Sequence, residues 1–213
     1  HLLERVPPRE AHEAARVLEV AREPDRAGPR LLARPACELG PLGHEGVLAF
    51  ADCAIVADPD PTQLAEIAIA TARSYESVTG ATPHVAMLSF STKGSASHPT
   101  AQKMEEATAL ARQLAAQRAL EADFEGELQV DAALVPEIAS RKLPENAVAG
   151  HANVLVFPDL NSGNIASKLV QHMARANAYG QILLGLDRPA SDVSRGASAH
   201  DILGVAAIIG LQS

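Results

Sequence analysis

Apolar runs alternate with amphipathic segments over most of the chain. Runs of strand length predict five strands, at residues 47–56, 84–88, 127–130, 153–157 and 181–184. Apolar residues at helical spacing predict the helices between them, one that begins near residue 61 and others at residues 101–117, 132–140, 164–177 and 198–211. Strands that alternate with helices are typical of right-handed β-α-β units. The sequence therefore predicts an α/β fold with a mostly parallel sheet flanked by helices.

The helix that begins near residue 61 has the clearest start signal. Asp60 suits the N-cap, Pro61 suits the first helical position, and Gln63 completes a capping box. The buried face predicted for this helix consists of Leu64, Ile67, Ala68, Thr71, Ala72 and Tyr75.

Residues 1–41 differ from the rest of the chain, because prolines and charged residues interrupt any regular pattern. Residues 11–22 predict a helix whose apolar positions are Ala15, Val17, Leu18 and Val20. No clean strand pattern accompanies it. We interpret this part either as loosely packed or as a fragment of a domain whose partner segments are missing.

Composition narrows the class of protein. The 213 residues are 47% hydrophobic and carry a net charge of −8, which predicts a folded protein without the basic face of a non-specific nucleic-acid binder. Aromatic residues make up 3% of the chain, so stacking platforms for bases are not expected. Cys37 and Cys53 form no metal knuckle, and we interpret them as reduced, small hydrophobic residues. With no apolar run of membrane-span length and no secretory pattern at the start, we expect a cytoplasmic protein without a membrane partner.

Three loops at predicted carboxyl ends of strands are candidates for ligand binding, since ligands of parallel sheets bind there. The first, residues 89–97, contains Ser91, Thr92 and Lys93 among other small and hydroxyl residues. Such a loop can direct amides and hydroxyls towards a phosphate, and a plain polar turn explains it equally well. It lacks the residue order of a Walker P-loop, which disfavours an NTPase.

The second loop, residues 157–164, enters a predicted helix through Asn161, Ser162, Gly163 and Asn164. Asn or Ser can cap the helix, Gly permits close approach of a ligand, and the free amides of a helix start attract anions. These residues exceed what capping alone needs, so we favour a binding role.

The third loop, residues 191–201, places a hydroxyl, a guanidinium and a glycine just before a helix, in Ser194, Arg195 and Gly196. Asp201 falls in the first helical turn, where a carboxylate commonly serves only to stabilise the helix dipole. A guanidinium beside a glycine suits the oxygens of a phosphate or an acyl phosphate.

Five stretches in this order resemble the phosphate acetyltransferase (phosphotransacetylase) family, of the phosphate acetyl/butyryl transferase type. They are residues 48–54 (LAFADCA), 85–92 (VAMLSFST), 128–133 (LQVDAA), 157–164 (FPDLNSGN) and 194–196 (SRG). The resemblance runs over residues 46–213 and leaves the amino-terminal part unmatched. Arg30 and Arg34 lack the pattern that surrounds the family's further phosphate-binding arginines, so no such role is transferred to them.

The resemblance implies a reversible reaction of acetyl phosphate with coenzyme A that yields acetyl-CoA and inorganic phosphate, with no metal and no permanently bound cofactor. Ser194 and Arg195 match the family's active-site pair, and Asp201 matches its proposed general base. In the implied mechanism the CoA thiolate attacks the acetyl carbonyl directly. The expected substrate-binding residues are Ser91, Thr92, Lys93, Asn161, Gly163, Asn164 and Gly196.

The resemblance also implies a two-domain architecture of the phosphotransacetylase type, which is similar to that of isocitrate and isopropylmalate dehydrogenases, with the site between the domains. Residues 1–49 would be an incomplete or atypical part of the first domain and residues 50–177 the second domain. Residues 178–213 would return to the first domain. The family is typically homodimeric, so a homodimer is expected.

Two related functions stay open: a non-catalytic domain that senses acetyl-CoA, and a phosphate butyryltransferase. The presence of Ser194, Arg195 and Asp201 favours the enzyme over the sensor. A zinc protein is a weak alternative, because the histidines show no paired ligand spacing.

Overall fold

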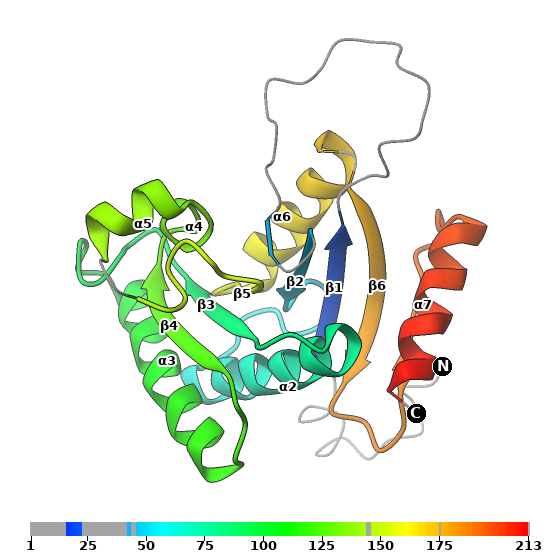
Figure 1. The fold of residues 1–213 in the computed structure, drawn as a ribbon, viewed down its shortest axis with the longest axis horizontal. Coiled ribbons are helices and arrows are strands. Elements are labelled where there is room, and N and C mark those ends of the chain that lie inside the picture. Colours follow the sequence, from blue (N-terminus) through cyan, green and yellow to red (C-terminus); the bar gives the residue numbers. More distant parts are fainter. Residues whose placement is uncertain (1–15, 23–41, 44–45, 144–145, 175, 213) are drawn as a thin grey trace.

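The computed structural model describes residues 16–22, 42–43, 46–143, 146–174 and 176–212. Within these ranges, seven strands form one sheet in the order β4-β3-β5-β2-β1-β6-β7 (Figure 1). The strands are β1 (Arg16–Arg22), β2 (Val47–Ala51), β3 (His84–Leu88), β4 (Asp123–Leu128), β5 (Val154–Val156), β6 (Asn177–Leu184) and β7 (Ala190–Ser191). The helices are α2 (Pro61–Thr79), α3 (Pro99–Gln117), α4 (Val130–Leu134), α5 (Pro136–Lys142), α6 (Leu160–Met173) and α7 (Ala199–Leu211).

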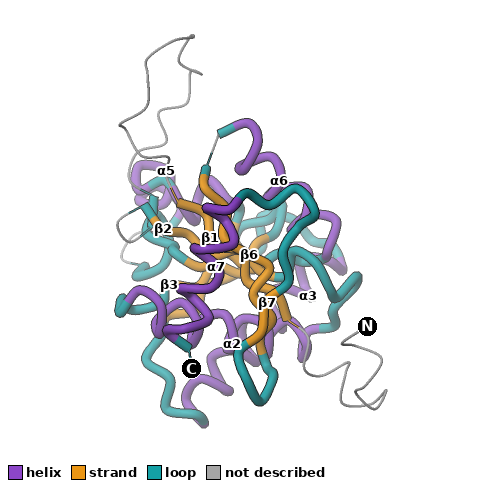
Figure 2. Tube along the Cα trace, turned by 90° about the vertical axis from the view of Figure 1, so that its right-hand side faces the viewer, coloured by secondary structure: helices purple, strands orange, loops and turns teal. Residues whose placement is uncertain are grey.

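The sheet has a parallel half and an antiparallel half. Strands β4, β3, β5 and β2 run parallel to their neighbours, as predicted. Strand β1 pairs antiparallel with both β2 and β6, and β7 adds antiparallel to β6. Figure 2 views the molecule from the side of the antiparallel half, where α7 lies nearest the viewer. The α/β class with a parallel sheet and flanking helices is confirmed.

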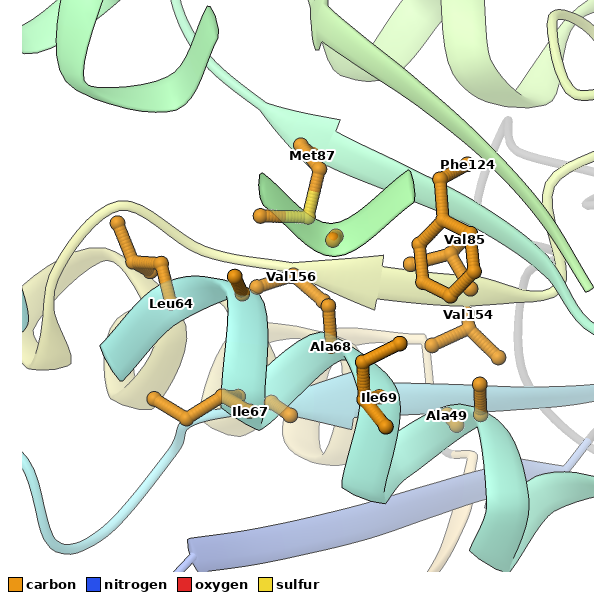
Figure 3. Close-up of a cluster of buried hydrophobic side chains, with 14 of the residues drawn as sticks. Ala49, Leu64, Ile67, Ala68, Ile69, Val85, Met87, Phe124, Val154 and Val156 are labelled. Atoms are coloured by element: carbon orange, nitrogen blue, oxygen red, sulfur yellow. The ribbon is translucent and has the colours of Figure 1, made fainter. Parts of the chain in front are cut away.

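Alternate residues of the central strands face two separate cores, because successive side chains of a strand point to opposite faces. Val85 and Met87 of β3 pack with α2 and α3, whereas Ala86 and Leu88 face the other core, with α4 and α6. Figure 3 shows Leu64, Ile67, Ala68 and Ile69 of α2 against β5, β3 and β2. The parallel half is therefore covered on both faces.

Helix α2 confirms its predicted start and buried face. Gln63 N donates to Asp60 Oδ1 at 2.8 Å and Asp60 N donates to Gln63 Oε1 at 3.0 Å, which forms the predicted capping box ahead of Pro61. All six residues of the predicted face are buried. The helix ends at Gly80, whose φ of 68° is the left-handed conformation that glycine adopts at little cost.

The helix predicted for residues 11–22 is wrong where the structure describes it, since Arg16–Arg22 forms strand β1. Residues 11–15 lie outside the described residues. Both edges of β1 are paired along the sheet, and this two-sided ladder outweighs a weak local helical pattern. Its two valines also favour a strand.

Other boundaries move by a few residues. Strand β4 is Asp123–Leu128 rather than residues 127–130, and β2 ends at Ala51. The helix predicted at residues 132–140 is two helices, because Val135, which precedes a proline, adopts an extended conformation.

Residues from 178 onward supply most of β6 and all of α7, and β6 lies beside β1. This placement agrees with a carboxyl-terminal segment that returns to the amino-terminal part of the chain, while the division into domains at residues 49 and 177 stays a prediction. Among the helices that the structure describes, none is long and apolar enough to cross a lipid bilayer.

Candidate active site

The loop after β2 is organised by one buried carboxylate. Asp52 is 3% exposed, and its Oδ1 accepts from the amides of Ala54 (2.8 Å) and Ile55 (3.2 Å). Its Oδ2 accepts from the amide of Val56 at 2.7 Å. These three bonds end β2 and fold the chain into a turn, since a carboxylate that accepts several amides fixes the local backbone.

Helix α6 packs its first turn directly on this loop. A Cβ atom on Gly163 would lie 2.2 Å from the carbonyl oxygen of Asp52, so this position requires glycine for close packing. Asn164 Nδ2 donates to the carbonyl of Cys53 at 2.9 Å. Asp159 caps the helix by accepting from Ser162 N at 2.9 Å, and Asn161 is exposed beside it.

The loop between β3 and α3 is closed on itself. Six consecutive amides, from residue 91 to residue 96, donate to acceptors within the protein. The bonds run from Ser91 N to Ser89 Oγ (3.2 Å), Thr92 N to Ser95 Oγ (3.0 Å), Lys93 N to Glu127 O (3.1 Å), Gly94 N to Glu127 Oε1 (2.8 Å), Ser95 N to Thr92 O (3.1 Å) and Ala96 N to Ser91 Oγ (3.0 Å). These amides are therefore not directed at a ligand, and any anion held here must meet side chains.

Two buried carboxylates of β4 hold that loop. Glu127, 3% exposed, accepts from Ser91 Oγ at 2.8 Å as well as from the amide of Gly94. Glu125, 7% exposed, accepts from Lys93 Nζ at 2.5 Å, from Arg112 at 2.9 Å and from Asn146. Sequence reasoning missed both residues, and the one available signal was a pair of acids inside an otherwise apolar strand.

The pKa of Glu125 reflects two opposing effects. Burial raises it, but hydrogen bonds from Lys93, the amide of Gly126 and Asn146, together with the charge of Arg112, outweigh burial and lower the pKa below its ordinary value. Glu125 is thus a carboxylate at neutral pH, bound to two cations.

The segment that enters α7 is open by contrast. Residues 194–197 form a turn in which Ala197 N donates to the carbonyl of Ser194 at 2.9 Å. Ser194 and Arg195 are exposed, and among the described residues Arg195 has neither an ion pair nor a hydrogen bond. Asp201 Oδ2 accepts from Ser198 N at 2.7 Å and Ser198 Oγ accepts from Asp201 N at 3.2 Å, a capping box that leaves Oδ1 without a described partner.

The predicted site residues fall into two groups. The first lies at the carboxyl ends of the adjacent strands β3, β5 and β2, where Lys103 of α3 also bonds to Asp58 of the loop after β2 at 3.0 Å. The second is the α7 entry (residues 192–201), beyond β1. In Figure 1 the α3 side lies at the left and α7 at the right, so this chain does not bring the Ser194 group beside the Ser91 loop.

A cleft of about 450 Å³ lies on the outer side of β4. Arg112, Phe124, Glu125, Asn146 and Val148 are among the residues that line it, and none of the predicted site residues does. In the part of the chain that the structure describes, no group of three His, Cys, Asp or Glu residues is placed to bind a metal. The metal-free site stays a prediction.

Sequence comparison finds one family in common. The model for the phosphate acetyl/butaryl transferase family matches residues 31–209. The phosphate acetyltransferase of Acetivibrio thermocellus is 52% identical over 179 residues, which are 84% of this chain and 52% of that protein. The phosphate acetyltransferase of Thermoanaerobacterium thermosaccharolyticum is 49% identical over the same coverage. The chain thus spans about half the length of the curated relatives it matches.

Solved structures give the same likeness. The EutD phosphotransacetylase from Staphylococcus aureus aligns with a TM-score of 0.78 at 39% identity, over 92% of this chain and 53% of that one. A phosphotransacetylase from Streptococcus pyogenes aligns with a TM-score of 0.76 at 41% identity, again over 92% and 53%. A branched-chain phosphotransacylase from Enterococcus faecalis, 21% identical with a TM-score of 0.68, shares the fold.

Proposed function

The chain belongs to the phosphate acetyl/butaryl transferase family, and from this premise we propose that it carries the acyl-transfer residues of a phosphate acetyltransferase. The reaction is the reversible transfer of an acetyl group between acetyl phosphate and coenzyme A. The observation that carries the proposal is the α7 entry, where an exposed hydroxyl, an unpaired guanidinium and a carboxylate lie within eight residues of each other.

Each group has a distinct role in the proposed mechanism. Asp201 accepts the proton of the CoA thiol, which is mostly protonated at neutral pH, and the thiolate attacks the carbonyl carbon of acetyl phosphate. The bond from that carbon to the phosphate oxygen breaks, and inorganic phosphate leaves with the electron pair. Arg195 holds the phosphate oxygens, and the Ser194 hydroxyl donates to the oxyanion that develops.

The capping box supports the role of Asp201 as a base. One oxygen of its carboxylate is fixed by Ser198 N, so the side chain has a defined orientation. The other oxygen is available for a proton, and the exposed position keeps it in reach of a substrate.

The remaining predicted contacts belong to the proposal with roles that differ in kind. Asn161 and Gly196 are exposed and open to a ligand, and Gly163 shapes the packing beneath them. Asn164 and the pair of Ser91 and Thr92 hold the loops in place through the bonds described above. Lys93 is the loop's cation. Coenzyme A is a substrate here and not a resident cofactor.

The decisive experiment measures thiol release from acetyl-CoA in the presence of phosphate. Wild-type protein should turn over, and Arg195→Ala or Asp201→Asn should abolish most turnover while CoA binding, measured by calorimetry, survives. Binding of acetyl-CoA without turnover would instead identify a sensor domain. A higher kcat/KM with butyryl-CoA than with acetyl-CoA would identify a butyryltransferase.

We also propose a homodimer in the cytoplasm, on the family likeness alone. Size-exclusion chromatography with light scattering tests the dimer, which a single monomeric peak would contradict. Fractionation of the source cells tests the compartment.

A further inference from the structure

The turn after β3 has a conformation that its sequence alone does not favour. Lys93 has φ of 49° and Gly94 has φ of 76°, so two successive residues are left-handed. Glycine adopts this conformation freely, but a lysine does so at a cost of about 1 kcal/mol. Another part of the protein must therefore stabilise Lys93 in this state.

Glu127 supplies that stabilisation from 33 to 36 positions away in the chain. Its carbonyl accepts from Lys93 N at 3.1 Å and its carboxylate accepts from Gly94 N at 2.8 Å, so it binds the amides of both left-handed residues. The same carboxylate oxygen accepts from Ser91 Oγ at 2.8 Å. A carboxylate that is 3% exposed and bonded in this way is more than a surface acid.

The turn in this conformation directs the Lys93 side chain along β4. Its Nζ donates to Glu125 Oε1 at 2.5 Å and to the carbonyl of Gly126 at 3.1 Å. An ammonium has three N–H groups, so one is left over among the described contacts, and the side chain is 38% exposed. A fixed, partly exposed cation at the carboxyl end of a parallel strand suits a phosphate group.

We propose that Glu127 is a positioning residue, which holds the Ser91–Ala96 turn so that Lys93 presents its ammonium to a phosphate group of the substrate. The proposal rests on the proposed function and extends it to a residue outside the family motifs quoted above. Acetyl phosphate, inorganic phosphate and coenzyme A all carry such a group, and the experiment separates them.

The test compares Glu127→Ala with Glu127→Gln, in which the amide oxygen still accepts from Gly94 N and Ser91 Oγ. Glu106→Ala, an exposed acid of α3, is the matched control. For each protein, KM is measured separately for phosphate and for acetyl-CoA, together with kcat. Hydrogen exchange of residues 91–96 is followed in parallel.

Glu127→Ala should raise KM for one of the two substrates about tenfold, which corresponds to about 1.4 kcal/mol, with kcat changed less than twofold. Exchange in residues 91–96 should accelerate, and Glu127→Gln should restore most of both properties. The substrate whose KM rises identifies which phosphate Lys93 meets. Lys93→Met should raise the same KM, and the double variant should be no worse than either single one.

A rise in exchange with both KM values unchanged would overturn the proposal and leave Glu127 a purely structural residue. An equal fall in kcat and kcat/KM would also overturn it. If Glu127→Ala fails to fold, Glu127→Asp replaces it, because the shorter side chain cannot reach both donors. Absence of turnover in the wild type is failure of the proposed function, and titration of inorganic phosphate or CoA into wild type and Lys93→Met then tests the positioning role by itself.

Discussion

The loop between β3 and α3 and the entry into α7 are rich in the same residue types, yet the fold treats them in opposite ways. In the first, every amide from residue 91 to residue 96 and the lysine side chain are bonded to the protein. In the second, Ser194 and Arg195 are exposed, and the guanidinium has no partner in the described residues. Hydroxyls and a cation in a loop thus do not by themselves indicate whether the loop binds a ligand or holds itself together.

The difference predicts different consequences for substitution. Where polar groups satisfy one another, loss of one leaves buried partners unpaired and weakens the fold. Where they face solvent, the same change affects ligands and leaves the fold unchanged. The predictions below separate the two regions, beginning with the largest expected effect.

Arg195→Ala should reduce turnover by about 10²–10³-fold, because removal of one preorganised donor to a developing charge typically costs that much. The melting temperature should stay within about 1 °C of wild type, since the side chain is exposed and unpaired. Thiol-release kinetics and a thermal melt on the same sample check both points. A large drop in melting temperature would show that the α7 entry resembles the closed loop after all.

Gly163→Ala should destabilise the protein by about 1–3 kcal/mol, because its Cβ would lie 2.2 Å from the backbone oxygen of Asp52 and force α6 away from the sheet. Gly196→Ala is the matched control at the α7 entry. No atom lies within 4 Å of the Cβ that alanine would add there. Urea unfolding of both variants measures the free energies, and equal losses would contradict the contrast.

Acid should weaken the closed loop before neutral substitutions do. The pKa of Glu125 is lowered in the folded protein by its hydrogen bonds and by Arg112, which outweigh its burial. The unfolded chain therefore binds the proton first, so the stabilisation is complete above about pH 5 and is lost as pH falls through the lower folded value. Unfolding at a series of pH values should show this loss, and Glu125→Gln should flatten it.

Ser198→Ala should have the smallest effect on stability, about 1 kcal/mol, through loss of the N-cap bond to Asp201 N. It should also free the Asp201 side chain, whose orientation the capping box fixes. Urea unfolding measures the first effect, and the pH profile of kcat/KM measures the second. An unchanged profile would show that the cap does not orient the base.

The sequence was informative wherever a residue's neighbours along the chain decide its conformation. The start of α2 at Asp60 and Pro61 and the buried face of that helix follow from local rules, and both are confirmed. The span of β3 is confirmed as well, because its apolar run is bounded by polar residues.

Local reasoning failed where distant partners decide. Strand β4 carries Glu125 and Glu127, which read as exposed acids until Lys93, Ser91 and Arg112 arrive from other elements. The same limit applies to the candidate site. Motifs placed Ser194 and Arg195 in one turn, but the separation of that turn from the Ser91 loop follows from the strand order, which no motif contains.

Strand β1 has a consequence for the order of events as the chain folds. It pairs with β2 about thirty residues later and with β6 about one hundred and sixty residues later, so one strand joins neighbours of very different sequence separation. Distant pairings carry the larger loop-closure cost and form late. We therefore predict that β2, β3 and β5 assemble first and that β6 docks last, like the final stave of a curved wall. Pulse-labelled amides of β6 should then gain protection after those of β3, and simultaneous protection would rule out this sequence of steps.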